Sequence, residues 1–376
     1  MSKDLYCPMI HGGLNVNLKA SDQNQLAFNQ CCLSTSLLEH IKPSEVIWHN
    51  DQLTKLRQTN DQNQWDQGCW ECERLEASGS SSFRLDMINK FGVKRNLSGP
   101  QRIDLLFDRS CNLACRTCGP HSSTFWQRHL KENNIPFGNF SNTTKFEDIL
   151  STLNSIDLTN VEMIQFCGGE TLMGNTYWRT ADAIADLAPH AKDQITLGFQ
   201  TNGTQRIDEQ NFKTIEKFQL VKILISLDGI GDRFNYMRWP ADWNQVADNI
   251  MWMREHLPVN VMFLIQETAS NLNLFYHDEV SNWVDANFST NRLGDITNYA
   301  KQLAIHDYLN VDTITEEYYQ AISSLNIVNL LSPTWQENPL AIKKMIEEVE
   351  MYDKLRNQNW RTVFPEVVEF YSRYLR

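Results

Sequence analysis

Three closely spaced cysteines constrain this chain more than any other feature of its sequence. Cys111, Cys115 and Cys118 form a C-x3-C-x2-C motif in the segment DRSCNLACRTCGP. One tight loop can then present three thiolates to a single iron-sulfur cluster and leave one iron of a 4Fe-4S cube open. The alternative is a zinc loop, which prefers paired C-x2-C units with a fourth Cys or His, and His121 lies three residues beyond the motif. The spacing favours the cluster.

Cysteine distribution and charge narrow the class of protein. All nine cysteines except Cys167 lie in the first third of the chain, which points to metal or cluster ligation and not to a disulfide scaffold. A net charge of -12 disfavours nucleic-acid and membrane partners. The N-terminus MSKDLYCPMIHGG has neither the basic stretch nor the apolar core of a secretory signal, so we expect a cytoplasmic protein.

Short apolar runs alternate with helical patterns over residues 99–334. Strands are predicted at 102–107, 161–166, 195–199, 221–227, 259–265 and 327–331. This order predicts an α/β fold, a partial (β/α)6 TIM-like barrel whose motifs follow the strands at the C-terminal rim. Residues 1–98 lack the alternation and are predicted to form a separate cysteine-rich α+β module, and residues 335–376 are predicted to form closing helices.

A second motif gives the first family resemblance. Phe166-Cys167-Gly168-Gly169-Glu170 follows the second predicted barrel strand, and together with the C-x3-C-x2-C motif it resembles the radical S-adenosylmethionine (SAM) superfamily. The resemblance implies a 4Fe-4S cluster on the three cysteines, with SAM chelated by the open iron and cleaved reductively to a 5′-deoxyadenosyl radical. It also implies that the Gly-Gly-Glu segment binds the methionine ammonium. The glycines let backbone carbonyls approach the ammonium, and the Glu170 carboxylate can balance its positive charge. Cys167 itself is expected to be a buried strand-end thiol.

Further matches follow in the family's order. The residues that the resemblance assigns to SAM binding are Thr201 and Asn202 after the third strand, Ser226 and Asp228 on the fourth, Arg238, Asn273 after the fifth, and Leu331 in the sixth-strand element. Arg238 could pair with a carboxylate or form a surface ion pair. One position departs from the family: the residue before the third cysteine is usually aromatic and packs near adenine, and here it is Thr117.

The N-terminal residues resemble the half-sized auxiliary-cluster module called a twitch (SPASM-like) domain. The matching residues are Cys7-Pro8, Cys31-Cys32, Trp48, Asn50, Leu56-Arg57, Cys69-x2-Cys72, Glu76, Gly79, Ser82 and Arg84. The resemblance implies a second 4Fe-4S cluster on Cys7, Cys31, Cys69 and Cys72, with Cys32 as the alternative to Cys31, because neighbouring residues on a strand point to opposite faces. A structural zinc knuckle is the other interpretation.

Two features depart from this module. Asp22-Gln23-Asn24 and Gln30 stand where glycine and proline are usual, and the module precedes the barrel instead of following it. Asp and Asn can still make the turn.

These resemblances imply an enzyme whose radical abstracts hydrogen from a substrate while the second cluster accepts an electron. We expect oxidation or cross-linking of a peptide or protein side chain, with a flavodoxin- or ferredoxin-type reductant. A dehydrogenase or tailoring enzyme acting on a sugar or small cofactor is the alternative substrate class. A non-catalytic electron carrier or a zinc-binding interaction module is the alternative of another kind, although neither needs a SAM pocket.

Overall fold

The computed structural model describes residues 4–18, 26–34, 48–77, 79, 81–288, 300–303, 307–323 and 335–375. The chain divides into two compact units. The first unit consists of residues 1–110, 138–200 and 207–223, and the second unit consists of residues 111–137, 201–206 and 224–376.

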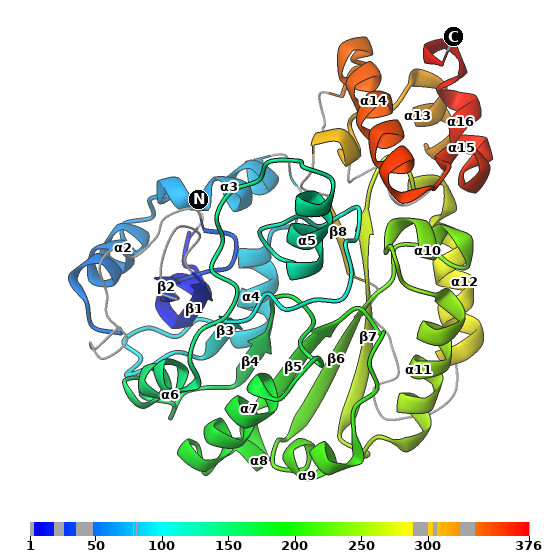
Figure 1. Cartoon of the computed structure of the whole chain (residues 1–376). Helices are drawn as coiled ribbons and strands as arrows, with labels where there is room; N and C mark the ends of the chain where they lie inside the picture. Colours follow the sequence, from blue (N-terminus) through cyan, green and yellow to red (C-terminus); the bar gives the residue numbers. More distant parts are fainter. Residues whose placement is uncertain are drawn as a thin grey trace. The chain divides into compact units, whose positions relative to one another are not determined.

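The first unit carries the N-terminal helices and the first strands (Figure 1). Its strands are β1 (Gly13–Leu18), β2 (Leu26–Asn29), β3 (Arg102–Leu106), β4 (Met163–Phe166) and most of β5 (Thr196–Thr201), with the first half of β6 (Leu220–Ser226). Its helices are α1 (Pro8–Gly12), α2 (Asp51–Asp61), α3 (Trp70–Ala77), α4 (Phe83–Phe91), α6 (Phe146–Asn154), α7 (Thr176–Leu187), α8 (Ala191–Gln194) and α9 (Phe212–Ile215).

The second unit carries the remaining elements. They are the strands β7 (Val261–Ala269) and β8 (Ala300–Leu303), and the helices α5 (Thr124–Glu132), α10 (Asp232–Met237), α11 (Trp243–His256), α12 (His277–Phe288), α13 (Glu316–Ile322), α14 (Pro339–Arg356), α15 (Trp360–Val363) and α16 (Pro365–Phe370).

Hydrogen bonds order the strands as β2-β1-β3-β4-β5-β6-β7-β8. Seven of these strands form a parallel sheet, and β2 pairs with β1 in the antiparallel direction. The predicted α/β class is therefore confirmed, and a partial barrel fits the six strands β3 to β8. Segment 13–17 pairs in parallel with 102–106, so the N-terminal residues extend the sheet through β1. The proposed division at residue 98 stays a prediction.

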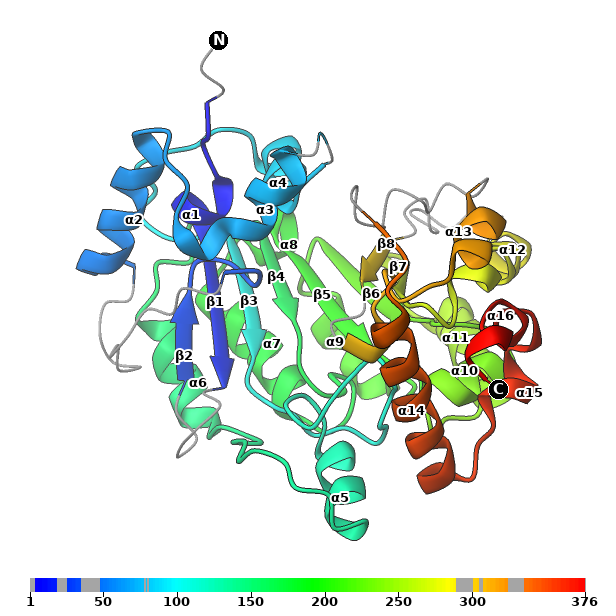
Figure 2. The same cartoon turned by 90° about the horizontal axis from the view of Figure 1, so that it is seen from above.

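One face of the first unit's strands packs against helices. Phe166 of β4 and Phe199 of β5 are fully buried, and their ring centroids lie 5.0 Å apart. Trp178 of α7 packs on Phe199 at 4.6 Å. Figure 2 shows α6 and α7 on this side of the strands. The alternation of apolar residues along each strand produces this covered face.

The opposite face of the same strands is polar at its centre. Asn15, Asp104, Gln165 and Gly198 are directly paired across β1, β3, β4 and β5. The first three of these side chains are almost completely buried. A parallel sheet that only needed stability would carry apolar residues here, so this row is a candidate for a function inside the barrel.

Packing in the second unit centres on the C-terminal helices. Helix α14 begins at Pro339 after the N-cap Asn338, whose side chain accepts hydrogen bonds from two backbone amides, and it ends before Asn357 in the left-handed conformation. Its apolar stripe is buried with residues of α10, α13 and α16. The predicted closing helix over residues 342–352 is thus part of a larger core.

The structure contains one strand that the sequence did not predict. The strand beside β7 is β8 at Ala300–Leu303, a segment whose sequence AKQL gave no strand signal. The predicted strand at 327–331, the site residue Leu331 and the turn residues Asp22-Gln23-Asn24 lie outside the described residues.

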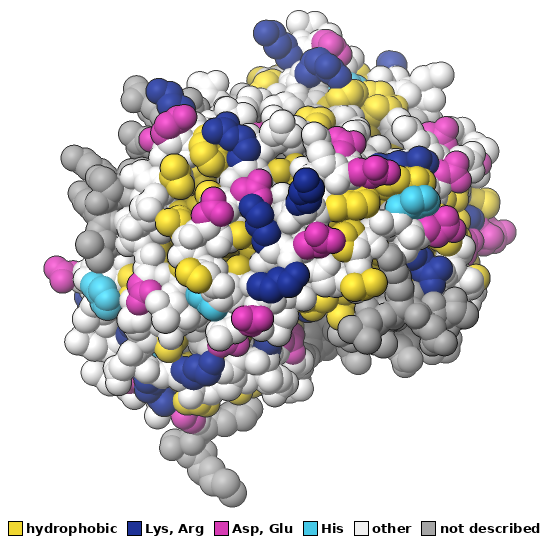
Figure 3. All heavy atoms as spheres, turned by 90° about the horizontal axis from the view of Figure 1, so that it is seen from below, with side chains coloured by type: hydrophobic (Ala, Val, Ile, Leu, Met, Phe, Trp, Pro, Cys, Tyr) yellow, Lys and Arg dark blue, Asp and Glu magenta, His cyan; other side chains and the backbone are white. Residues whose placement is uncertain are grey.

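Among the side chains coloured in Figure 3, basic and acidic residues are interspersed, so the net charge of -12 is not gathered on that face. Among the helices of the described ranges, none is both long enough and apolar enough to cross a bilayer.

Candidate functional site

The three cysteines of the C-x3-C-x2-C motif lie in the loop after β3. Cys115 is buried, and Cys111 and Cys118 are partly exposed. Burial raises the pKa of Cys115, and burial together with the negative charge of Cys115 raises the pKa of Cys118 to about 12. The Cys115 and Cys118 thiols are therefore protonated in the metal-free protein, and metal binding must displace their protons.

Two backbone hydrogen bonds hold this cysteine loop in place. The Ala114 amide donates to the Trp239 carbonyl over 2.8 Å, and the Arg116 amide donates to the Met237 carbonyl over 2.7 Å. Both acceptors follow or end α10. The loop is thus fixed on both sides of Cys115 by one segment of the second unit.

Asp228 connects the end of β6 to the cysteine loop. Its carboxylate is fully buried and accepts hydrogen bonds from the Thr268 amide at 2.8 Å and the Thr117 hydroxyl at 3.1 Å. It also pairs with Arg238 at 2.9 Å. The other Arg238 amino group, Nη1, lies 3.8 Å from the Cys115 sulfur. Arg238 thus forms a buried ion pair and not a surface one, and Thr117 belongs to the same network.

Asn273 fixes the backbone around Asp228. Its amide nitrogen donates to the carbonyls of Asp228 at 3.1 Å and Thr268 at 3.0 Å, and its oxygen accepts from the Ser270 amide at 2.7 Å. Ser226 is buried two residues before Asp228. Predicted residues from two strands therefore meet in one hydrogen-bonded group.

We predict that Asp228→Asn destabilises the metal-free protein by roughly 3–5 kcal/mol, because the Arg238 guanidinium is left buried without its anion. Urea unfolding followed by circular dichroism measures the change. Asp182→Asn is the control, since its pair with Lys217 is about two-fifths exposed and is worth less than about 1 kcal/mol. Equal losses in the two variants would contradict the prediction.

Asn202 joins the end of β5 to the same loop. Its Nδ2 lies 3.8 Å from the Cys111 sulfur, and its Oδ1 accepts from the Thr204 amide at 2.9 Å. The Thr201 hydroxyl accepts from the Gly203 amide at 3.1 Å, which shapes the turn. The structure therefore places an amide donor beside Cys111 and a guanidinium beside Cys115.

The Gly168-Gly169-Glu170 turn follows β4 in the first unit. Gly168 has φ +134°, a conformation that favours glycine. A Cβ on Gly169 would lie 2.1 Å from the carbonyl oxygen of Ser110, so only glycine fits there. The Glu170 amide donates to that Ser110 carbonyl at 2.7 Å, and the buried Glu170 Oε1 accepts from the Leu172 amide at 3.0 Å. This turn is packed directly against the end of the strand segment that precedes the cysteines.

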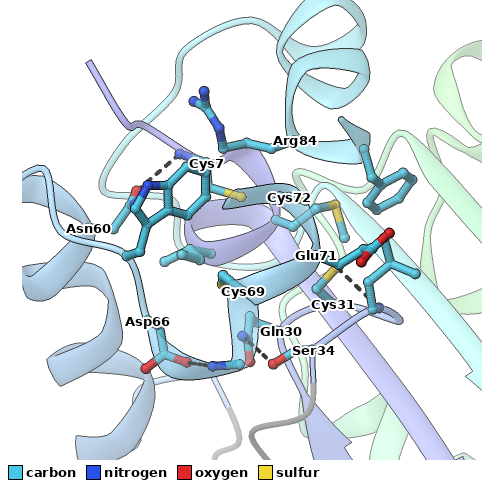
Figure 4. Close-up of a pocket in the computed structure, with 16 residues that line it drawn as sticks. Cys7, Gln30, Cys31, Ser34, Asn60, Asp66, Cys69, Glu71, Cys72 and Arg84 are labelled. Atoms are coloured by element: carbon cyan, nitrogen blue, oxygen red, sulfur yellow. Dashed lines mark hydrogen bonds between the residues drawn. The ribbon is translucent and has the colours of Figure 1, made fainter. Parts of the chain in front are cut away.

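A second group of thiols lines one pocket near the N-terminus. Cys7 precedes α1, Cys31 follows β2, Cys69 directly precedes α3, and Cys72 lies in the first turn of α3. All four line the same pocket, and their sulfur atoms lie around one space in Figure 4. Cys32 does not line it.

The chemistry of this thiol pocket suits a metal cluster. Burial raises the pKa of Cys7 to about 11 and that of Cys69 to about 12, and each thiolate disfavours the others. Arg84 lines the pocket as well, paired with Glu76 at 2.6 Å. Thiols packed this closely are stabilised when a positively charged metal core replaces their protons.

Cys32 and Cys167 belong to a different environment. Asp104 accepts a 2.8 Å hydrogen bond from Arg102, and its second carboxylate oxygen is buried without a partner. Burial first, then the charges of Asp104 and Cys32, raise the pKa of Cys167. Cys167 thus lies near the polar face of the sheet and apart from the two cysteine groups, whereas Cys32 also interacts with the neighbouring Cys31 thiol and raises its pKa.

The thiol spacing bears on the zinc alternatives. Within the described part of the chain, no three Cys, His, Asp or Glu side chains converge closely enough to hold one metal ion. A zinc site needs four ligands about 2.0–2.3 Å from one centre, whereas a cube of four irons spreads its cysteines over four corners.

Sequence reasoning missed the charged residues of α14 that support the cysteine loop. Arg116 is fully buried and pairs with Asp353, which also accepts from the Tyr236 hydroxyl at 2.7 Å. Asp353 and Arg356 continue the buried stripe of α14 at helical spacing. The sequence signal that could have identified these residues is the presence of charged side chains at positions that continue the apolar stripe of α14.

Comparisons with known proteins give structural neighbours and a family model that matches part of the chain. No curated protein matches the chain. Similar solved structures include native anSMEcpe with bound AdoMet, 16% identical with a TM-score of 0.40, aligned over 69% of this chain and 62% of that protein. Another is Streptococcus suis SuiB bound to precursor peptide SuiA, 12% identical with a TM-score of 0.38, aligned over 94% and 74%.

The chain thus spans less than two thirds of the length of anSMEcpe. A model of the Radical SAM superfamily matches residues 105–276, the segment that holds the cysteine loop and all the polar strand ends described above.

Proposed function

We propose that this chain is a radical SAM enzyme that oxidises or cross-links a side chain of a peptide or protein. The family implies SAM and a 4Fe-4S cluster as cofactors. When bound, they supply a 5′-deoxyadenosyl radical that removes a hydrogen atom from the substrate. The observation that carries the proposal is the hydrogen-bonded network that joins the cysteine loop to Asn202, Asp228 and Asn273.

Cys111, Cys115 and Cys118 would hold the cluster. The Asn202 and Arg238 side chains each direct an N–H group at one of these sulfurs from 3.8 Å. Such donors stabilise thiolates and gain little from neutral thiols. This arrangement supports an anionic centre at the loop, which neither a buried set of thiols nor a simple turn requires.

The Gly-Gly-Glu turn, Asp228 and Arg238 would bind SAM. Glu170 is buried and already holds the Leu172 amide with one oxygen. Its negative charge has the right sign for the methionine ammonium. Arg238 carries the charge needed for the methionine carboxylate, although Asp228 holds one of its amino groups.

Glu170→Gln is expected to weaken SAM binding about ten- to a hundredfold, because loss of the charge-assisted bond costs roughly 1.5–3 kcal/mol. The Gln carbonyl can keep the bond to the Leu172 amide, so the variant removes charge while preserving the turn. Titration calorimetry of the reconstituted protein measures the affinity. Glu162→Gln is the control, since Glu162 pairs with Lys94 at the surface. An unchanged affinity for SAM would indicate that the Gly-Gly-Glu segment is only a structural turn.

The pocket of Cys7, Cys31, Cys69 and Cys72 would hold the auxiliary cluster. Four protein thiolates leave no iron open to substrate, which supports an electron-accepting role over substrate binding. The resemblance to auxiliary modules, whose enzymes act on peptide and protein side chains, supports the peptidyl substrate. We further propose a cytoplasmic setting with a flavodoxin- or ferredoxin-type reductant.

The test is anaerobic reconstitution followed by incubation with SAM, reductant and candidate peptides. Mass spectrometry is expected to detect 5′-deoxyadenosine and a peptide that has lost two hydrogen atoms. Sugar-like or cofactor-like substrates tested in parallel address the small-molecule alternative. If the protein binds iron yet makes no 5′-deoxyadenosine with any reductant, it is an electron carrier and the proposal is wrong.

A further inference from the structure

Arg356, in the last turn of α14, is buried with its charge unanswered. Arg356 is only 6% exposed to solvent. None of its three guanidinium nitrogens has a hydrogen-bond partner. A buried cation without an acceptor is strongly unfavourable, and the described part of the chain provides no anion that pairs with it.

The acidic residue nearest in sequence is already occupied. Asp353 accepts from Arg116 and from the Tyr236 hydroxyl with one oxygen, and from the Trp360 amide at 2.6 Å with the other. No carboxylate of the described residues forms an ion pair with Arg356. Burial and the charge of Arg116 lower the pKa of Arg356 to about 10, so it remains charged at neutral pH.

Two tryptophans place this charge against the cysteine loop. The Arg356 guanidinium carbon lies 4.5 Å from the ring centroid of Trp126 and 4.9 Å from that of Trp239. The Trp126 indole donates to the Cys115 carbonyl at 2.8 Å, and the Trp239 carbonyl accepts from the Ala114 amide at 2.8 Å. The rings that hold Arg356 are therefore bonded to the segment that presents Cys115.

We propose that Arg356 balances the charge of the iron-sulfur cluster on the cysteine loop and raises its reduction potential. The inference rests on the proposed function. A 4Fe-4S core with three thiolates carries net negative charge, and reduction adds one electron and one further negative charge. A fixed cation nearby stabilises the reduced form more than the oxidised form.

This role involves a residue outside the segment that the family model matches. Arg356 lies on α14, outside residues 105–276. It does not contact SAM or substrate in this scheme, so it is a positioning residue that acts through the cluster. Arg238, which reaches the same Cys115, is neutralised by Asp228, and Arg116 is neutralised by Asp353. Arg356 is thus the uncompensated charge of the three.

The experiment is a redox titration of the reconstituted full chain followed by electron paramagnetic resonance, with the relevant cluster identified by its spectral change on adding SAM. At the potential that half-reduces the wild-type cluster, Arg356→Met is expected to lower the ratio of reduced to oxidised cluster about tenfold, which is 59 mV for one electron. Arg356→Lys, which keeps the charge, should titrate near the wild type. Arg361→Met is the matched control, because Arg361 is exposed and pairs with Glu350.

An unchanged midpoint in a fully loaded Arg356→Met protein would overturn the inference. If that variant takes up no cluster, Arg356→Lys must load and titrate like the wild type, and failure of both variants would also overturn it. Thermal unfolding adds a readout independent of activity: reconstitution should raise the melting temperature of Arg356→Met less than that of the wild type. An equal gain would contradict the charge balance. A wild-type protein without any SAM-responsive cluster would instead contradict the proposed function.

Discussion

Replacement of Cys111, Cys115 and Cys118 together by alanine is expected to abolish 5′-deoxyadenosine formation. Under the proposed function these thiols hold the iron that is open to SAM, so the variant loses the group that would deliver the electron to the sulfonium. The assay is anaerobic incubation with SAM and dithionite, with the product measured by mass spectrometry. Iron content should fall from about eight to about four per chain, because the second cubane is untouched.

Cys167→Ala is the matched control for this variant. Cys167 lies in the same barrel segment but beside Asp104, and it does not line the thiol pocket. Its replacement should leave both iron content and SAM cleavage close to the wild type. Deoxyadenosine formation by the triple variant would remove the basis for the cluster assignment.

The fold could be predicted where local pattern determines it. The runs at 102–107, 195–199 and 221–227 correspond to β3, β5 and β6, because buried parallel strands consist of short apolar segments. β8 was missed, since the sequence AKQL has no such run. The parallel pairing of β1 with β3 was missed for another reason: the partner of a strand nearly ninety residues away is not encoded in its own pattern.

The candidate site could be predicted in its parts but not in its connections. Motif order identified Asp228, Arg238 and Asn273 separately, yet their shared hydrogen bonds depend on how distant strand ends meet. Arg238 illustrates the limit, because sequence alone could not distinguish a surface ion pair from the buried pair that the structure has. The choice of Cys31 over Cys32 stays a prediction, although only Cys31 lines the thiol pocket.

Replacement of Cys69 and Cys72 together by alanine is expected to separate radical formation from substrate turnover. Both residues line the N-terminal pocket, and neither belongs to the cysteine loop after β3. Cleavage of SAM without substrate should continue, because the barrel cluster makes the radical unaided. Product formation should be lost, since the substrate electron left after hydrogen abstraction has no acceptor. Deoxyadenosine and modified substrate are quantified in the same reaction.

A structural role of the second cluster must be distinguished from this redox role. The pocket is built from short segments around Cys7, Cys31 and Cys69, so binding of the proposed cluster would also supply folding energy to this part of the chain. Circular dichroism and iron analysis therefore accompany the assay, and Cys32→Ala serves as the neighbouring control that leaves the pocket intact. Cys31→Ala should behave like the double variant, because its thiol faces the same space. If a folded variant without the second cluster turned substrate over at the normal rate, electron transfer would not pass through the pocket and the N-terminal thiols would serve stability alone.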